Sequence, residues 1–313
     1  MPIRSYQSGD EEAQARIYNI AAAALPGFKP TKPEEIARRY HAADSDSKMR
    51  FYATENGEVV GYAVFSYVGR LSFPWCLPGA EMLREPLLSA MLCEMKKRDI
   101  TEAWAAYRAD WSPVLAFLRG HEFTEKRFMV NFFAETSCLP AADRLPANRI
   151  VEHLQSDELP RVVKLTPALF VDIDVHTLNR FLWENPYYKF PERLLALKDP
   201  GTGEIHAASL LVSDDRFADP TKIDSSMPCF RLGAFGTERE RHKRVNGLFS
   251  CVFRNESDAD LLLHAALTTT DGTAKLTLLA AQAPSDVPAL CSWYDRHFQR
   301  QGSFPIFSRE LLP

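Results

Sequence analysis

Several features that narrow the function of a protein are scarce in this chain of 313 residues. Its six cysteines include no CxxC-type pair, which argues against a disulfide scaffold and a cysteine metal site. The eight histidines lack HExxH or any other metal-ligand spacing, so we expect no metal. No apolar run approaches the ~18–20 residues of a membrane helix, and we therefore expect no membrane partner.

An excess of either charge is also missing. Lys and Arg number 37 against 41 Asp and Glu, which gives a net charge of −4. This balance provides no global attraction to nucleic acid, and we expect no nucleic-acid partner, although the basic run at 239–244 leaves a local patch open. The polar residues 1–14 contain no apolar stretch and predict no secretory signal. We expect free thiols and a cytoplasmic protein.

The composition is that of an ordinary soluble globular protein, with 46% hydrophobic and 25% charged residues. The length admits one large domain or two of ordinary size.

The first part of the chain alternates strand and helix signals. Residues 50–54 and 59–67 are rich in aromatic and β-branched residues and flank Asn56-Gly57, which predicts a β-hairpin. Apolar residues at helical spacing predict a long helix over 81–98. The other predicted strands cover 3–6, 71–77, 103–107 and 126–133; the other predicted helices cover 11–24 and 113–119, and one more opens at 31–35.

The same order restarts after a segment with two prolines and little apolar periodicity, residues 137–148. We therefore predict two domains, 1–136 and 149–313, joined by this linker. In the second domain, strands at 193–198 and 205–212 flank a turn of Asp, Pro and Gly. Further predicted strands lie at 149–154, 230–235, 275–281 and 304–307, and predicted helices begin at Ser156, Thr177, Asn246 and Val287.

Matching residues near the end of each domain support an internal repeat. Five of them share an offset of 175 residues, among them Pro113 with Pro288 and Phe123 with Phe298. Two tandem copies of one α/β unit explain this order; a single mixed domain with coincidental hairpins is the alternative.

The order of elements in each copy resembles the GCN5-related N-acetyltransferase (GNAT) fold. Residues 105–123 look like the late strand, helix and turn of that family, and Arg244, Gly247 and Phe249 look like its acyl-CoA signature, R/Q-x-x-G-x-G/A. The resemblance implies an α/β (α+β) fold class. Each of the two units would be a mixed, mostly antiparallel twisted sheet flanked by helices.

The resemblance also implies acetyl-CoA or another acyl-CoA as co-substrate, bound by the second copy. A loop entering a helix at Asn246 would offer backbone N–H groups and the helix dipole to the pyrophosphate, and glycine would permit a close approach. A solvated charged loop is the alternative. The expected cofactor-binding residues are Ala234, Phe235, Gly236, Lys243, Arg244, Val245, Asn246, Gly247 and Leu248.

The corresponding loop of the first copy departs further from the family pattern. It contains one glycine, Gly79, and has Pro86 close behind; Arg84 could still contact a phosphate. We therefore expect a degenerate N-terminal copy that supports the second one by packing or shapes a substrate site.

In the resembled family an amine attacks the thioester directly and a tyrosine often protonates the departing thiolate. Tyr294 lies near the position of that tyrosine and is the candidate general acid. Packing at a helix surface, with its hydroxyl in water, is the alternative. Glu238, His206 and Asp214 are candidates for the base, and we expect Gln282, Ser285 and Asp286 to follow a strand and line the cofactor site.

These observations predict an acyl-CoA-dependent N-acyltransferase that acts on a primary amine of a small molecule or peptide. A non-catalytic pseudo-acetyltransferase, which senses CoA esters or binds a protein, is the alternative. The sequence does not specify the acceptor, the base or the oligomeric state.

Overall fold

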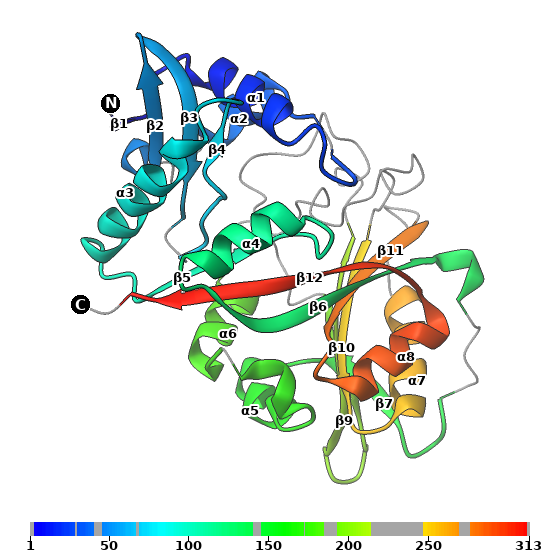
Figure 1. Cartoon of the computed structure of the whole chain (residues 1–313). Helices are drawn as coiled ribbons and strands as arrows, with labels where there is room; N and C mark the ends of the chain where they lie inside the picture. The colour runs from blue at the N-terminus through cyan, green and yellow to red at the C-terminus, as the bar shows by residue number, and fades with distance from the viewer. Residues whose placement is uncertain are drawn as a thin grey trace. The chain divides into compact units, whose positions relative to one another are not determined.

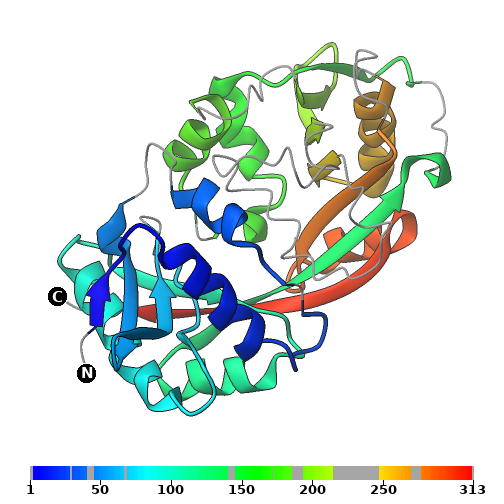
Figure 2. The same ribbon diagram turned by 90° about the horizontal axis from the view of Figure 1, so that it is seen from above.

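The structure is a computed structural model that describes residues 3–28, 30–40, 46–66, 69–139, 145–171, 173–184, 193–213, 247–268 and 276–311. These residues form helices and two β-sheets, of which one is antiparallel and the other mixed (Figures 1 and 2). Among them, no helix has the length and apolar character needed to cross a membrane.

The elements of the first part of the chain follow the predicted order closely. The hairpin turns at Asn56 and Gly57, which both have the positive φ that such a turn requires. The long helix buries the apolar stripe that predicted it, including Leu87, Met91 and Met95. The elements are β1 (Ile3–Ser5), α1 (Asp10–Ala21), α2 (Pro33–Tyr40), η1 (Ser47–Met49), β2 (Arg50–Glu55), β3 (Glu58–Val64), β4 (Trp75–Cys76), η2 (Glu81–Leu83), α3 (Arg84–Lys96), β5 (Glu102–Ala106), α4 (Ser112–Gly120), β6 (Thr124–Glu135) and η3 (Thr136–Cys138).

The second part repeats this order. The elements are β7 (Ile150–His153), η4 (Ser156–Glu158), α5 (Leu159–Val163), η5 (Pro167–Phe170), α6 (Val175–Trp183), β8 (Leu194–Lys198), β9 (Ile205–Ser213), β10 (Gly247–Phe253), α7 (Glu256–Thr268), β11 (Leu278–Pro284), α8 (Pro288–His297) and β12 (Gln299–Glu310). The helix predicted from Asn246 is wrong, because residues 247–253 form strand β10 and the helix begins only at Glu256. The strand predicted at 230–235 lies outside the described residues.

In the described part of the chain the strands form two sheets. One has the order β1-β2-β3-β4 and the other the order β5-β12-β6-β11-β10-β9-β8-β7. Most pairs are antiparallel, as predicted, while β10 and β11 run parallel.

The last strand of each repeat pairs with the other repeat. Strand β6 lies antiparallel to β11, with Phe133 opposite Ala280. Strand β12 lies antiparallel to β5, with Phe307 opposite Ala105. The two repeats therefore exchange their final strands, which the local sequence pattern did not indicate.

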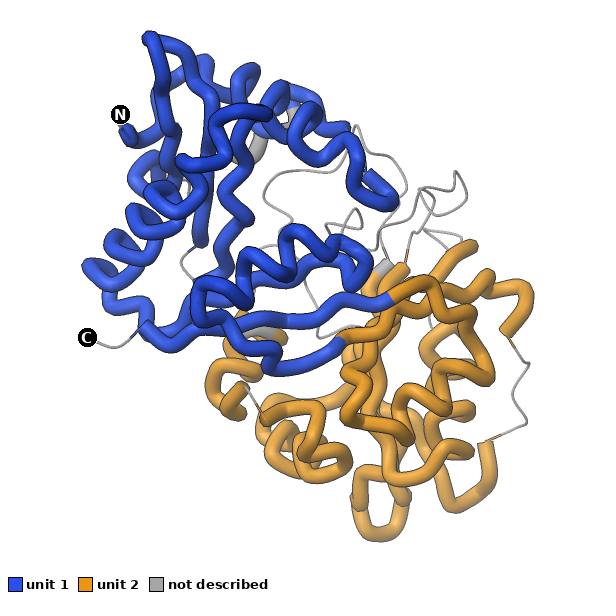
Figure 3. Tube along the Cα trace, in the orientation of Figure 1, with its two compact units in different colours: residues 1–128, 224–238, 303–313 blue, residues 129–223, 239–302 orange. Residues whose placement is uncertain are grey.

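This exchange gives two compact units that differ from the sequence segments 1–136 and 149–313 (Figure 3). Of the described residues, one unit contains those up to 128 and 303–311, and the other contains 129–213 and 247–302. The domain boundaries predicted for the repeat itself stay a prediction.

The second unit has its main core on one face of its sheet. There α7 and α8 lie side by side against β9, β10 and β11 (Figure 1). The core includes Leu262 of α7, Trp293 of α8 and Phe249 of β10, each at most 2% exposed. Helix α5 contacts β9, and Lys198 on the other face of β8 forms an ion pair of 2.8 Å with Glu158 just before α5.

Candidate functional site

The ladder between parallel strands β10 and β11 is short. Among the described residues only two positions pair, Gly247 with Leu279 and Leu248 with Ala280. Beyond them, β10 continues to pair with β9 and β11 with β6, but no further pairs join β10 to β11. We call residues 249–253 of β10 and 281–284 of β11 the ladder end. Backbone groups of β10 that point toward β11 there have no ladder partner.

A tyrosine hydroxyl meets this edge of β10. The Tyr294 hydroxyl donates a hydrogen bond to the Phe249 carbonyl oxygen at 3.4 Å. The Cys251 thiol also donates to the hydroxyl, with 3.9 Å between sulfur and oxygen. The residue predicted as general acid therefore directs its oxygen to the ladder end, from helix α8.

The Tyr294 side chain is fully buried. Its ring stacks on Phe132 with 5.1 Å between centroids and meets Phe298 edge-on at the same distance. Burial raises the pKa of Tyr294 well above its usual value of 10, because an ionised phenolate would lose its hydration. The alternative of a hydroxyl in water at a helix surface is wrong, while the general-acid role stays a prediction.

The opposite face of the ladder end carries polar side chains. On this face, Ser250 is the first residue of β10 beyond the last pair, and Gln282 is the first of β11. Ser250 is exposed and Gln282 half-buried, whereas the other ladder-end residues of the two strands are buried. Gln282 donates a hydrogen bond of 3.0 Å to Asn131 of β6, which is only 3% exposed.

Sequence reasoning missed Ser250 and Asn131 and placed Gln282 after its strand rather than within it. The signal was present, because each is the single polar residue in an apolar stretch of its strand: 128–134, 247–253 and 278–284. Reading it required the correct strand boundaries, and residues 247–253 were assigned to a helix.

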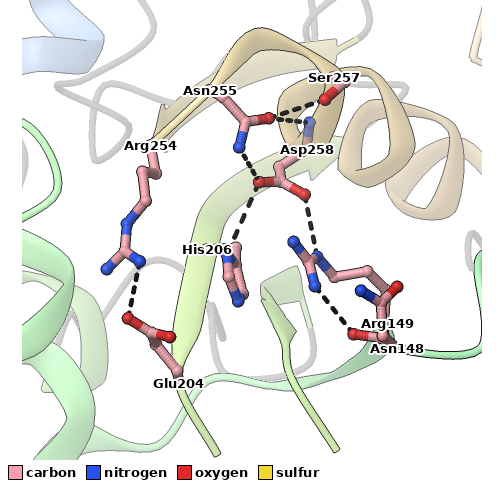
Figure 4. A network of polar contacts seen from close by, with 8 residues as sticks. All are labelled: Asn148, Arg149, Glu204, His206, Arg254, Asn255, Ser257 and Asp258. Carbon is pink, nitrogen blue, oxygen red and sulfur yellow. Dashed lines mark hydrogen bonds and ion pairs between the residues drawn. The ribbon is translucent and has the colours of Figure 1, made fainter.

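The start of helix α7 is occupied by the protein's own polar groups (Figure 4). The Asn255 side chain accepts a hydrogen bond of 3.0 Å from the Asp258 backbone N–H, as a helix N-cap does. The Asp258 carboxylate, 5% exposed, accepts from Asn255 and from Arg149, the latter at 3.0 Å. A carboxylate thus lies in the first helical turn, where the helix dipole favours an anion.

His206 of β9 also faces Asp258, with 3.8 Å between its Nδ1 and the carboxylate (Figure 4). It is 9% exposed, and neither ring nitrogen has a hydrogen-bond partner in the described part of the chain. His206 therefore lies at the start of α7 and not at the ladder end. The other base candidates, Asp214 and Glu238, lie outside the described residues.

Most of the cofactor-binding residues expected from the sequence lie outside the described residues: Ala234, Phe235, Gly236, Lys243, Arg244, Val245 and Asn246. Gly247 and Leu248 are described and belong to the paired start of β10. The expectation that they lead into a helix is wrong. A Cβ at Gly247 would lie 2.5 Å from Leu279 Cδ2 and 2.8 Å from Leu276 Cδ2, so packing against β11 accounts for this glycine. The role of Gly247 and Leu248 in cofactor binding stays a prediction.

The first repeat has a similar short parallel contact. Leu71 donates to the Trp104 carbonyl at 2.8 Å, and Trp104 donates to the Gly69 carbonyl at 2.9 Å. Two residues further on, the Phe73 backbone N–H donates to the Tyr107 hydroxyl at 2.5 Å. A tyrosine oxygen thus meets the free strand edge in both repeats.

The loop of the first repeat also binds one of its own carboxylates. The Gly79 backbone N–H donates to Glu81 at 2.8 Å. Arg84, the first residue of α3, lies over the Phe73 ring at 5.3 Å, and its buried Nε has no hydrogen-bond partner among the described residues. The expectation of a degenerate copy stays a prediction, and the Glu81 contact agrees with it.

Comparisons with known proteins define the fold. No family model matches the sequence, and no curated protein matches it. The structure is similar to a crystal structure of a GCN5-related N-acetyltransferase from Sphaerobacter thermophilus. Its TM-score is 0.63 and its identity 14%, over 100% of this chain and 96% of that one.

Two further solved structures agree. One is a GCN5-related glucosamine N-acetyltransferase region of a fungal multi-domain GH3 β-N-acetylglucosaminidase, with a TM-score of 0.65 and 13% identity; the match covers 98% of this chain and 38% of that protein. The other is a tandem GNAT protein from the clavulanic acid biosynthesis pathway, with a TM-score of 0.51 and 12% identity over 100% of this chain and 99% of that one.

The chain therefore has a tandem GNAT fold, as its element order predicted. The repeat-level resemblance and the mixed α/β fold class are confirmed. At 12–14% identity, these similarities establish the fold alone.

Proposed function

We propose that the chain is an acyl-CoA-dependent N-acyltransferase, with acetyl-CoA as donor and a primary amine of a small molecule or peptide as acceptor. The observation that carries the proposal is the Tyr294 hydroxyl at the ladder end, where β10 has backbone groups free of β11. The reaction is assigned to the second repeat. The thioester arm lies along β10 beyond Leu248.

The proposed reaction is a direct transfer. The amine nitrogen attacks the thioester carbonyl carbon, so that a C–N bond forms and the C–S bond breaks. The nitrogen loses a proton to water, and the departing thiolate takes a proton from Tyr294. Burial raises the pKa of Tyr294 above 10, whereas a thiol has a pKa near 8.5, so the transfer itself is uphill; it is completed when the phenolate regains, through water, the proton that the amine released.

The Tyr294 hydroxyl and the donor would use the same backbone groups. The Cys251 N–H lies two residues along the same edge of β10 from the Phe249 carbonyl that the hydroxyl contacts, and a thioester or amide carbonyl can accept a hydrogen bond from it. In the proposed complex the Cys251 N–H polarises the donor carbonyl beside the Tyr294 hydroxyl. We also assign the protein to the cytoplasm, since the described cysteines are all free.

A second candidate function, a non-catalytic pseudo-acetyltransferase, is favoured by two carboxylates. Asp258 lies in the first turn of α7, and Glu81 binds the Gly79 N–H before α3. Each carboxylate takes a place where a phosphate would otherwise find backbone N–H groups. Such a protein would sense a CoA ester or bind a partner without turnover.

Calorimetric titration of the full chain with acetyl-CoA, up to millimolar concentration, tests donor binding. We expect saturable binding, together with protection of the amides of residues 249–253 from hydrogen exchange. Absence of binding would eliminate the acyltransferase. Binding without acyl transfer to any amine in a broad panel would favour the second candidate.

A further inference from the structure

The two strands of the ladder end present one closed face and one open face. On the closed face, Phe249, Cys251 and Ala281 pack into the core beneath α7 and α8, together with Tyr294. On the other face, Ser250 and Gln282 are the least buried residues of their strands. A molecule reaching the ladder end by way of these side chains meets Ser250 on one strand and Gln282 on the other.

The side chains at this face are neutral and hydrogen-bonding. A serine hydroxyl both donates and accepts, and a glutamine amide offers two donors and an acceptor. One Gln282 N–H donates a hydrogen bond to Asn131 Oδ1 at 3.0 Å, and this bond holds the Gln282 amide in one orientation. The Gln282 oxygen and its second N–H have no hydrogen-bond partner in the described part of the chain and are available to a ligand.

A buried amide in the middle of a sheet requires a physical explanation. Asn131 is 3% exposed and lies directly opposite Gln282 in the β6–β11 ladder. An apolar pair there would avoid the cost of desolvating two amides. The pair therefore lowers stability in order to fix the Gln282 amide on the face of the sheet that also carries Ser250, which is the arrangement of a preorganised binding group.

Carboxylates lie further away on this face of the same strands. The nearest on β6 is Glu135, four residues along from Asn131, and β10 and β11 themselves contain none; beyond the end of β11 the first is Asp286, four residues along from Gln282. Four residues of extended strand span roughly 13 Å. An acceptor with several positive charges would thus find no opposite charge from these strands at the ladder end.

We propose that Ser250 and Gln282, with Asn131 positioning Gln282, bind the acceptor amine and select one whose neighbouring groups are neutral hydroxyls or amides. This inference rests on the proposed function, since it names the acceptor class of the same site. Polyamines are disfavoured acceptors.

Direct amine binding tests the inference separately from acyl transfer. The full chain is titrated calorimetrically with glucosamine as the hydroxyl-bearing amine, glycylglycinamide as the amide-bearing amine and spermidine as the polycation, each with and without CoA. We expect glucosamine or glycylglycinamide to bind at least tenfold more tightly than spermidine. Which of the two binds more tightly identifies the hydroxyl or the amide as the recognised group.

Three variants locate the binding. Gln282→Leu and Ser250→Ala should each weaken binding of the preferred amine by about tenfold, the order of one or two lost hydrogen bonds. Ser89→Ala, the same change at an exposed position of α3, should not alter it. Ser250 is exposed, so its variant is expected to fold even if Gln282→Leu does not.

The outcomes separate the two proposals. Tighter binding of spermidine, no binding of any of the three amines, or unchanged amine binding by Ser250→Ala would each overturn the acceptor inference. A different result would overturn the acyltransferase and still support the amine site. In that case acetyl-CoA does not bind, while the neutral amine binds and Ser250→Ala weakens its binding.

Discussion

The Tyr294 hydroxyl donates a hydrogen bond to the Phe249 carbonyl oxygen at 3.4 Å, on the edge of β10 that β11 leaves free. This contact joins helix α8 to the point where the two parallel strands cease to pair. It places a phenol, held in the core by Phe132 and Phe298, at the backbone groups that the proposed donor would use.

The burial of Tyr294 predicts a specific loss of stability at high pH. Its folded-state pKa is raised above the value near 10 of an unfolded tyrosine. The contribution is therefore fully present below pH 10 and is lost as the pH rises above it, where the unfolded chain binds fewer protons than the folded one. Urea unfolding measured from pH 8 to 11 should show a declining free energy of unfolding.

Tyr294→Phe is the control for this decline, because it removes the titrating group and keeps the ring. The decline above pH 10 should be shallower in the variant. Tyr6, whose pKa is raised to about 12, contributes equally to both proteins. Identical slopes in wild type and variant would show that the Tyr294 phenol is not buried in solution.

Gly247 should resist replacement for reasons of packing. In Gly247→Ala the new Cβ would approach Leu279 and Leu276 to within 2.5 and 2.8 Å, and the strain should cost about 1–3 kcal/mol of unfolding free energy. Gly120→Ala is the matched control, since no atom lies within 4 Å of its Cβ position at the end of α4. Equal stability of the two variants would contradict the close packing of β10 on β11.

The charged groups at the start of α7 should contribute unequally to the stability of the fold. Asp258→Asn removes the charge that Arg149 faces in a site where the two side chains are 5% and 15% exposed, and should destabilise the fold by roughly 3 kcal/mol. Arg254→Ala breaks the exposed Arg254–Glu204 pair and should leave the melting temperature nearly unchanged. A melting temperature of Asp258→Asn equal to that of wild type would contradict the network in Figure 4.

The same two variants bear on the second candidate function. If Asp258 occupies the place of a phosphate, Asp258→Asn should bind acetyl-CoA more tightly than wild type, because a negative charge leaves the start of the helix. Arg254→Ala should not tighten binding. Weaker binding by Asp258→Asn would show instead that the carboxylate organises the site, and calorimetry distinguishes the two results.

The parts of the fold that the sequence predicted have local signals. The hairpin at Asn56-Gly57 and the apolar stripe of α3 each depend on residues that are close together in the sequence. The exchange of β6 and β12 is not, because an alternating strand can pair with either of two neighbouring edges and nothing in its own residues chooses between them.

Only part of the candidate site could be predicted from the sequence, for a related reason. Tyr294 followed from its place on the late helix, but the family signature at Arg244 and Gly247 led to a helix where β10 lies. A better local signal was available: Asn255, with Asp258 three residues later before an apolar run, is the pattern of a helix start. Ser250 and Gln282 depend on where the β10–β11 ladder ends, which is a tertiary property.

The central claim is acyl transfer at the second repeat with Tyr294 as the proton donor. The most direct measurement is the steady-state release of CoA thiol from acetyl-CoA, with the amine that binds most tightly, for wild type, Tyr294→Phe and Tyr107→Phe. We predict that Tyr294→Phe lowers kcat by about 10²-fold or more with little change in KM for acetyl-CoA. Tyr107→Phe, the same change at the equivalent edge of the first repeat, should retain the wild-type rate. Undiminished turnover in Tyr294→Phe, or no turnover in wild type that binds acetyl-CoA, would contradict the account.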